Sequence, residues 1–289
     1  MISLELRRRF FAEEIEAVAR LRSAALVDAL AAVPRDVFLG PGPWTVLAET
    51  DFTGAGPAKM GETPDADPAR VYHNIAVAID ASRQLFNGQP ATLAPWIDAL
   101  ELRPGARVLH VGAGTGYYTA VIAHCAGATG RVLALEADAA LAARARANLA
   151  PMPWIEVRAD AHATVAGEAF DAILVNAGVT HPLDAWLDAL APGGRMILPL
   201  TATMPAMGTI GKGVVFLLHR DGDAFTARLN GFVAIYSAVG IRDEALNAAL
   251  GKAMMAGPQR AQAVTRLRRD AHEAGAACWL HAPAFCLSA

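Results

Sequence analysis

Cysteine is scarce in this chain of 289 residues, which holds only three: Cys125, Cys278 and Cys286. Their odd number, their wide spacing and the lack of a Cys-x-x-Cys pair argue against a disulfide framework and against a zinc ribbon. We therefore expect a reducing, cytoplasmic environment. The eight histidines include no His-x-x-x-His pair, so the sequence predicts no metal site.

Charge is also sparse, at 18% of the residues, and the formal net charge is only −3. A chain that binds nucleic acid is normally strongly basic, so we expect no nucleic-acid partner. The sequence has no Gly-x-Ser-x-Gly motif, which disfavours a serine hydrolase. No apolar run follows the arginines at 7–9, so a secretory signal is not expected.

Residues 108–130 contain no Asp, Glu, Lys or Arg and would be long enough to cross a bilayer. Five of these residues are glycines, however, and polar Thr, Tyr and His side chains lie among them. This mixture indicates a strand, a glycine turn and a helix rather than a span in contact with lipid. We therefore expect no membrane partner.

The apolar fraction is high, at 54%, and supports a folded core rather than a disordered chain. We expect three parts: an N-terminal helical and loop region at 1–85, a core at 86–235 and a C-terminal helical extension at 236–289. In the extension, helices are expected around 244–255 and 259–273. The apolar run that starts at Cys278 fits either an added strand or an interface.

From residue 107 on, short apolar runs alternate with amphipathic segments. The runs expected as strands are 108–111, 132–135, 155–158, 172–175 and 196–200, and the segments expected as helices are 117–125, 139–149 and 182–190. Such alternation implies right-handed βαβ units and a mostly parallel, Rossmann-like sheet, hence an α/β fold. An antiparallel hairpin over 214–219 and 225–233 is expected at its edge, because Asp221-Gly222 favours a tight turn.

The first strand of this region is followed by a glycine-rich turn that opens a helix. Glycines permit a tight turn and let a ligand approach the backbone closely. A dinucleotide fingerprint would need its third glycine at Tyr117, and a P-loop would need a lysine that is missing here. The spacing Gly-x-Gly-x-Gly is instead that of S-adenosylmethionine-dependent methyltransferases. The residues expected to contact this cofactor are His110, Gly112, Ala113, Gly114, Thr115 and Gly116.

Acidic and amide side chains follow the next three strands. Glu136 ends the second strand, where a carboxylate can accept hydrogen bonds from both hydroxyls of a ribose. Asp160 and Ala161 follow the third strand, where an aspartate can accept from an adenine amino group. Asn176 ends the fourth strand at the same rim. Because ligands of such sheets bind at the carboxyl ends of the strands, we expect these residues to complete the cofactor site.

The chain resembles the protein-L-isoaspartate O-methyltransferases over about residues 25–235. The residues that carry the resemblance are Val33-Pro34-Arg35 with Phe38, Gly88-Gln89-Pro90, the turn from Gly114 to Ala120, and His219 to Gly222. The resemblance implies carboxyl O-methylation of an isoaspartyl or related carboxylate on a peptide or protein. It also implies S-adenosyl-L-methionine as the cofactor and a Rossmann-like methyltransferase fold.

The sequence departs from that family in two places. The family carries Thr or Ser before its Gln-Pro, in contact with the isoaspartyl substrate, whereas this chain has Phe86-Asn87-Gly88. The family also has a Glu at the end of the first strand, where this chain has His110. The alternatives are therefore a small-molecule O- or N-methyltransferase on the same scaffold, or a cofactor-binding relative without catalysis.

A carboxylate acceptor needs no general base, because it is already ionised at pH 7. Under this hypothesis Asn87 and Gln89 orient the acceptor, and Asn176 faces the methyl group that is transferred. A hydroxyl or amine acceptor would need a base instead. The candidates for that base are His181 and His110.

Overall fold

The structure is a computed structural model, and it describes residues 2–48, 60–160, 165, 167–203 and 209–289. The chain forms two compact units, and each is discontinuous in sequence. The first comprises Met1–Gly105, Ala113–Val132 and Ala139–Val157, and the second comprises Ala106–Gly112, Leu133–Asp138 and Arg158–Ala289. This partition cuts across the expected parts at 1–85, 86–235 and 236–289, which remain a prediction. Among the described residues no helix is long and apolar enough to cross a membrane.

Helices dominate the first unit, as the apolar spacing of its sequence predicts. Their bounds are α1 Leu4–Ala19, α2 Ala24–Ala32, α3 Pro90–Ala99, α4 Tyr117–Ala126 and α5 Ala139–Leu149, with short 3₁₀ helices η1 Arg35–Phe38, η3 Pro68–Val71 and η4 Ala81–Arg83. Serine side chains begin the first two helices: Ser3 Oγ accepts from the Leu6 N–H and Ser23 Oγ from the Leu26 N–H, both at 3.2 Å.

A small antiparallel sheet in the first unit was not predicted. Its order is β2-β1-β3-β4, with bounds β1 Thr45–Leu47, β2 Gly61–Glu62, β3 Ala76–Asp80 and β4 Leu85–Phe86. Strands of two to five residues are too short to display an alternation of apolar and polar positions. Residues 49–59 of the expected N-terminal helical and loop region lie outside the described residues.

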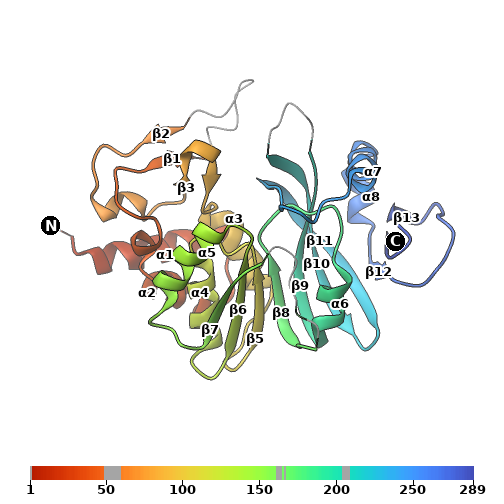
Figure 1. Ribbon diagram of the computed structural model, residues 1–289, viewed down its shortest axis with the longest axis horizontal. Helices are drawn as coiled ribbons and strands as arrows, with labels where there is room; N and C mark the ends of the chain where they lie inside the picture. Colours follow the sequence, from red (N-terminus) through yellow and green to blue (C-terminus); the bar gives the residue numbers. More distant parts are fainter. Residues whose placement is uncertain (1, 49–59, 161–164, 166, 204–208) are drawn as a thin grey trace. The chain divides into compact units, whose positions relative to one another are not determined.

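The large sheet has ten strands in the order β13-β14-β12-β11-β10-β9-β8-β5-β6-β7 (Figure 1). The strands predicted from the alternating pattern are β5 Arg107–Val111, β6 Arg131–Glu136, β7 Ile155–Ala159, β8 Phe170–Val175 and β9 Leu190–Ala202, and α6 spans Asp184–Ala189. The pairs β5–β8 and β8–β9 are parallel. The predicted α/β fold is thus confirmed.

The antiparallel edge of this sheet extends beyond the predicted hairpin. The hairpin is present as β10 Ile210–Asp221 and β11 Ala224–Tyr236, and three short strands continue the sheet: β12 Arg266–Arg268, β14 Cys286–Ser288 and β13 Cys278–His281. Helix α7 spans Glu244–Met255, as expected. The helix expected over 259–273 is wrong, since α8 ends at Gln262 after beginning at Pro258.

Backbone pairing explains why the chain leaves the helix. The Ala227 N–H donates to the Thr265 carbonyl at 2.8 Å, and the Thr265 N–H donates to the Ser288 carbonyl at 2.9 Å. The next residues form β12, whose Leu267 lies opposite Phe225 and is buried. These bonds to distant strands override the local helical spacing of arginines and apolar residues.

One apolar cluster forms the core of the second unit. It joins Leu109 and Val111 of β5 to Trp186 of α6, Phe216 of β10 and Leu250 of α7. Trp279 and Leu280 of β13 belong to the same cluster. The C-terminal extension is therefore built into the core of this unit, and the apolar run after Cys278 is an added strand.

Candidate functional site

Four of the predicted cofactor residues lie side by side in the second unit. Gly112 follows β5, Glu136 ends β6, Asp160 follows β7 and Asn176 follows β8. Backbone hydrogen bonds tie these strand ends together: Gly112 N–H to Leu135 O at 2.8 Å, Asp160 N–H to Glu136 O at 3.0 Å, and Asn176 N–H to Val111 O at 2.8 Å. The carboxyl edge of neighbouring strands thus carries two carboxylates, an amide and a bare glycine, as the sequence predicts.

Gly112 cannot be replaced by a residue with a side chain without strain. Its φ is +82°, and a Cβ added there would lie 2.9 Å from the carbonyl oxygen of Asn176. The Asn176 side chain in turn donates from Nδ2 to the Gly112 carbonyl at 3.3 Å. The two strand ends are therefore packed backbone against backbone.

Glu136 and Asp160 supply negative charge at this edge. Both side chains are half-buried, and Glu136 Oε1 accepts from the Asp138 N–H at 3.0 Å, which fixes the carboxylate. A carboxylate can accept from two hydroxyls at once, as the 2′- and 3′-hydroxyls of a ribose require. These hydrogen-bond acceptors fit the hydroxyl and amino donors of the adenosine part of S-adenosylmethionine. Ala161, predicted beside Asp160, lies outside the described residues.

The rest of the glycine turn, Ala113–Gly116, belongs to the first unit. The Gly116 N–H donates to the Ala113 carbonyl at 2.9 Å, and Gly116, with φ +98°, precedes the first residue of α4. Helix α5 holds the turn from one side: Asn148 Nδ2 donates to the Thr115 carbonyl at 2.9 Å. A Cβ on Gly116 would lie 2.9 Å from Leu149 Cδ1. The positive φ of Gly116 therefore favours glycine, and a side chain there would also have to displace the end of Leu149.

The predicted acceptor segment, Asn87-Gly88-Gln89, is held by helix α4, which follows the glycine turn. Tyr118 of α4 donates its hydroxyl hydrogen to the Gly88 carbonyl at 3.2 Å. Tyr117 and Tyr118 are both buried, and their rings meet edge to face with centroids 4.9 Å apart. Burial raises the pKa of both tyrosines, so both hydroxyls keep their protons at neutral pH.

The side-chain amide of Asn87 is buried, and its oxygen is hydrogen-bonded. Its Oδ1 accepts from the Val77 N–H at 3.0 Å and from Arg35 Nη2 at 3.3 Å. Its Nδ2 is buried and has no hydrogen-bond partner within the part of the chain that the structure describes. Gln89 is half-buried and donates from Nε2 to the Asn74 carbonyl at 3.3 Å. A role of either residue toward the acceptor stays a prediction.

The two histidines named as possible bases differ in environment. His110 lies in β5 with no exposure to solvent, and burial lowers its pKa to about 3, which keeps the imidazole neutral. His181 is half-buried, its Nδ1 lies 2.9 Å from Thr180 Oγ1, and burial lowers its pKa. The predicted contact between His110 and the cofactor remains untested.

Comparison with known proteins identifies the family. A family model described as protein-L-isoaspartate(D-aspartate) O-methyltransferase matches residues 63–212. A protein-L-isoaspartate O-methyltransferase of Methylorubrum extorquens is 35% identical over 237 residues, which cover 80% of this chain and 89% of that protein. The chain belongs to the protein-L-isoaspartate O-methyltransferase family. Its relative of that name in Methylorubrum populi is 38% identical over 192 residues, covering 65% of this chain and 76% of the relative.

Solved structures agree on the fold of this family member. One entitled protein-L-isoaspartate O-methyltransferase has a TM-score of 0.60 and 20% identity, covering 84% of this chain and 69% of that one. Another, from Plasmodium falciparum, has a TM-score of 0.58 and 17% identity, covering 80% and 97%. The predicted family, the methyltransferase fold and the enzyme class, an S-adenosylmethionine-dependent methyltransferase, are confirmed.

Two arginines of this methyltransferase, one in each unit, hold segments next to predicted site residues, and the sequence did not assign them a role. Arg35 belongs to the Val-Pro-Arg motif that carries the family resemblance, and this motif was the signal that could have found it. Arg242 donates to the Gly178 carbonyl at 2.8 Å and to the Thr201 carbonyl at 2.6 Å. Gly178 comes two residues after Asn176, so Arg242 fixes the segment that follows Asn176. No sequence pattern marks Arg242.

Proposed function

We propose that this chain transfers the methyl group of S-adenosylmethionine to an isoaspartyl carboxylate of a peptide or protein. The observation that carries the proposal is the row of Asn176, Gly112, Glu136 and Asp160 along consecutive strand ends, in a chain of this family. The relative from Plasmodium falciparum was solved in complex with S-adenosyl-L-homocysteine, which supports the same cofactor here.

The cofactor is proposed to be held mainly by hydrogen-bond acceptors. Glu136 would accept from the ribose hydroxyls and Asp160 from the adenine amino group, with Gly112 giving close access to the backbone. The glycine turn Ala113–Gly116 and His110 are the further proposed contacts. S-adenosylmethionine, when bound, supplies a methyl group on a sulfonium centre, which is already a good leaving group.

The residues of the chain then need only to position the acceptor and exclude water. An isoaspartyl carboxyl has a pKa near that of other carboxyls, about 4, and is ionised at pH 7. Correct positioning of two reactants can lower the barrier by several kcal/mol without any proton transfer. Asn87 and Gln89 are proposed to orient the acceptor carboxylate, and Asn176 to face the transferred methyl group.

The proposal includes the cellular location of the protein and the class of its partner. None of the three cysteines forms a disulfide, which supports a reducing, cytoplasmic location. The net charge of −3 supports a protein or peptide acceptor rather than nucleic acid. No part of this proposal requires a membrane.

The test uses methyl-labelled S-adenosylmethionine with an isoaspartyl peptide and, as control, its normal aspartyl twin. We expect base-labile methyl ester in the isoaspartyl sample only. The rate should show no dependence on a base that titrates near neutral pH, because the acceptor is already ionised. Label on neither peptide, with cofactor binding intact in the same preparation, would overturn the isoaspartyl acceptor and favour a small-molecule acceptor or loss of catalysis.

Variants of one carboxylate test the cofactor site separately. Glu136→Gln keeps the size of the side chain but replaces one acceptor oxygen by a donor. We expect it to weaken cofactor binding by about 10–100-fold, since a lost hydrogen bond to a charged group costs about 1.5–3 kcal/mol. Glu156→Gln is the matched control, because Glu156 is on neighbouring β7 and forms an exposed pair with Arg131. Equal effects of the two changes would contradict the assignment.

A further inference from the structure

The C-terminal strands bring four metal-ligating side chains together, beyond the family match that ends at residue 212. They are His272, Cys278, His281 and Cys286, and their ligand atoms all lie within 4.8 Å of one another. Two sulfur atoms bound to one zinc ion at about 2.3 Å in tetrahedral geometry lie about 3.8 Å apart. Movements of about 1 Å would therefore close the cluster around an ion.

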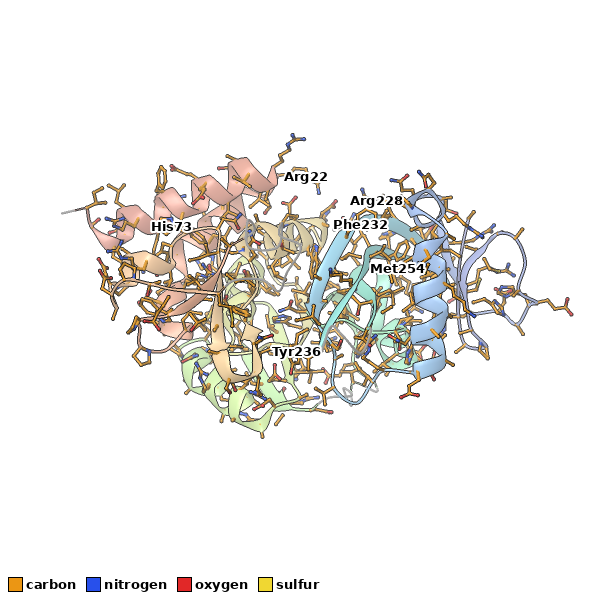
Figure 2. All side chains as sticks on the ribbon, turned by 90° about the horizontal axis from the view of Figure 1, so that it is seen from above. Arg22, His73, Arg228, Phe232, Tyr236 and Met254 are labelled. Atoms are coloured by element: carbon orange, nitrogen blue, oxygen red, sulfur yellow. The ribbon has the colours of Figure 1, made fainter. Side chains whose placement is uncertain are left out.

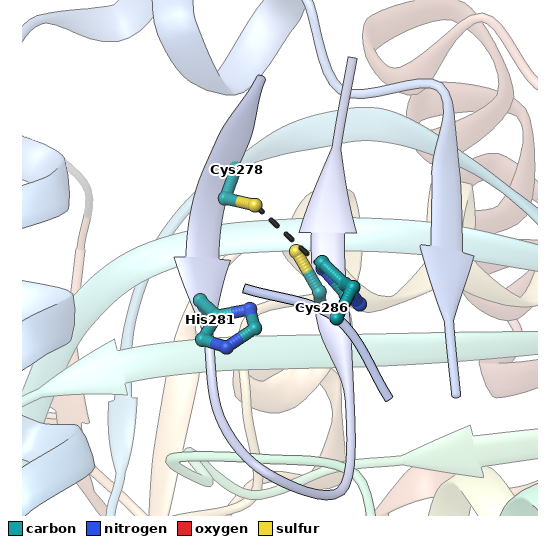
Figure 3. A group of neighbouring side chains, drawn as sticks. Cys278, His281 and Cys286 are labelled. Atoms are coloured by element: carbon teal, nitrogen blue, oxygen red, sulfur yellow. Dashed lines mark hydrogen bonds between the residues drawn. The ribbon is translucent and has the colours of Figure 1, made fainter. Parts of the chain in front are cut away.

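The strand register places three of these side chains on one face. His281 of β13 lies directly opposite Cys286 of β14, and Cys278 lies opposite Ser288, two residues further along β14. In a regular strand, Cys278 and His281 would face opposite sides of the sheet because they are three residues apart. The register shift between Cys278 and Leu280 corrects this, since a bulge re-aims the side chain before it. Figure 3 shows the sulfur atoms of Cys278 and Cys286 turned toward each other, with His281 beside them.

His272 reaches the cluster from the loop before β13. Its Nδ1 lies 2.9 Å from the Asp270 carbonyl oxygen, and its Nε2 lies 3.8 Å from Cys278 Sγ. Histidine ligands of metals almost always donate one ring N–H to a carbonyl or carboxylate and present the other nitrogen to the ion. His272 already has this arrangement.

Two further features of the cluster indicate a preformed metal site. The Nδ1 atom of His281 is buried and has no hydrogen-bond partner among the described residues. Such a buried, unsatisfied nitrogen needs a partner of some kind. The Gly275 N–H donates to Cys278 Sγ at 3.4 Å, a bond that stabilises sulfur as a thiolate.

We propose that His272, Cys278, His281 and Cys286 bind one Zn²⁺ ion as a tetrahedral, structural Cys₂His₂ site. Two thiolates neutralise the charge of the ion, and binding releases the two thiol protons to solvent. Four protein ligands leave no open position for catalysis, which makes the site structural. The sequence predicts no metal here, because the ligands are spaced His-x₅-Cys-x₂-His-x₄-Cys and only the sheet register gathers them.

A bound ion would also stabilise one side of a neighbouring groove. Trp279, next to Cys278, lines a groove of about 790 Å³ together with residues of β10, β11 and α8. Phe232 and Met254, labelled in Figure 2, line the same groove. The Trp279 ring also meets Phe216 edge to face, with centroids 5.4 Å apart. Metal at the cluster would therefore hold the end of the chain against the core of the second unit.

The experiment measures metal directly and is independent of methyl transfer. The full chain is made without a histidine tag, in medium that contains zinc, and its metal content is measured by mass spectrometry. We expect about one zinc per chain for the natural sequence. Cys125→Ser is the matched control, because Cys125 is a buried thiol on α4 outside the cluster, and His124→Asn is the control histidine. Both should keep the zinc.

Replacement of a ligand should remove the ion. Cys278→Ser and His281→Asn are expected to weaken zinc binding by more than the ~10–100-fold that loss of an outer-shell partner causes. Cobalt titration of the natural chain after removal of zinc gives a second measurement that needs no variant. We expect visible absorption of tetrahedral Co²⁺ and a near-ultraviolet band from thiolate to metal. Absence of zinc and of both bands, or a Cys278–Cys286 disulfide in freshly purified protein, would overturn the proposal.

Discussion

Arg35 donates a hydrogen bond from Nη2 to Oδ1 of Asn87 at 3.3 Å, and both side chains are buried in the first unit. The same guanidinium donates to the carbonyls of Val71 and Ile75, each at 2.7 Å. It also faces the rings of Phe11 and Tyr117 at 5.8 Å. A single cation of the Val-Pro-Arg motif thus fixes the segment that leads into Asn87.

Replacement of Arg35 should destabilise the first unit. In Arg35→Met the buried Val71 carbonyl and the partly buried Ile75 carbonyl lose their donor, and a buried group left without a partner costs about 1–3 kcal/mol. We expect the free energy of unfolding in urea to fall by about 3 kcal/mol or more. Arg9→Met is the control, because Arg9 forms an exposed pair with Asp28 and should cost less than about 1 kcal/mol. A small, equal loss in both variants would show that Arg35 does not hold this segment.

Gly112 offers a sharper test of the cofactor edge. In Gly112→Ala the new Cβ would lie 2.9 Å from the Asn176 carbonyl, so the two strand ends must separate. Cofactor binding should weaken at least about tenfold, which corresponds to about 1.4 kcal/mol, as measured by calorimetry. Gly193→Ala is matched, because Gly193 has φ +78° and no atom within 4 Å of its Cβ position. The Gly193→Ala variant therefore has the backbone strain without the steric clash, and it should bind the cofactor normally.

The parallel half of the large sheet, and the row of polar residues at its strand ends, could be predicted from the sequence for one physical reason. Strands β5, β6 and β8 are mostly buried, and Gly112, Glu136 and Asn176 mark their ends in the local pattern. The family resemblance supplied the rest of the assignment. These residues need no distant partner to be recognised.

The C-terminal strands could not be predicted in this way. β12 has three residues, with arginines at both ends and only Leu267 buried, and it exists because it pairs with β11 and β14. The metal cluster depends on a register shift in β13, which no spacing rule reveals. Arg35 was visible as part of a motif, but its bonds to three carbonyls depend on the path of the chain from Val71 to Ile75.

Arg242 is predicted to support the segment after Asn176. It donates to the Gly178 carbonyl, the Thr201 carbonyl and Asn247 Oδ1, at 2.6–2.8 Å. Arg242→Ala removes these bonds, and we expect a loss of about 2–3 kcal/mol in the free energy of unfolding and weaker cofactor binding. Arg228→Ala on the exposed face of β11 is the control. Unchanged cofactor affinity in a folded Arg242→Ala protein would limit the residue to a role in stability.

His110 should make the stability of the protein depend on pH below neutrality. Burial lowers its pKa in the folded state from 6.5 to about 3, so between these values the unfolded chain binds a proton that the folded chain does not. The free energy of unfolding therefore falls as the pH falls, by up to about 1.4 kcal/mol per pH unit from this residue. Stability is measured by urea unfolding from pH 7 to pH 4.5 for the natural chain and for His110→Met. The difference between the two slopes isolates the imidazole from the carboxylates that both proteins share. A slope unchanged in His110→Met would show that the imidazole binds its proton equally in the folded and the unfolded chain.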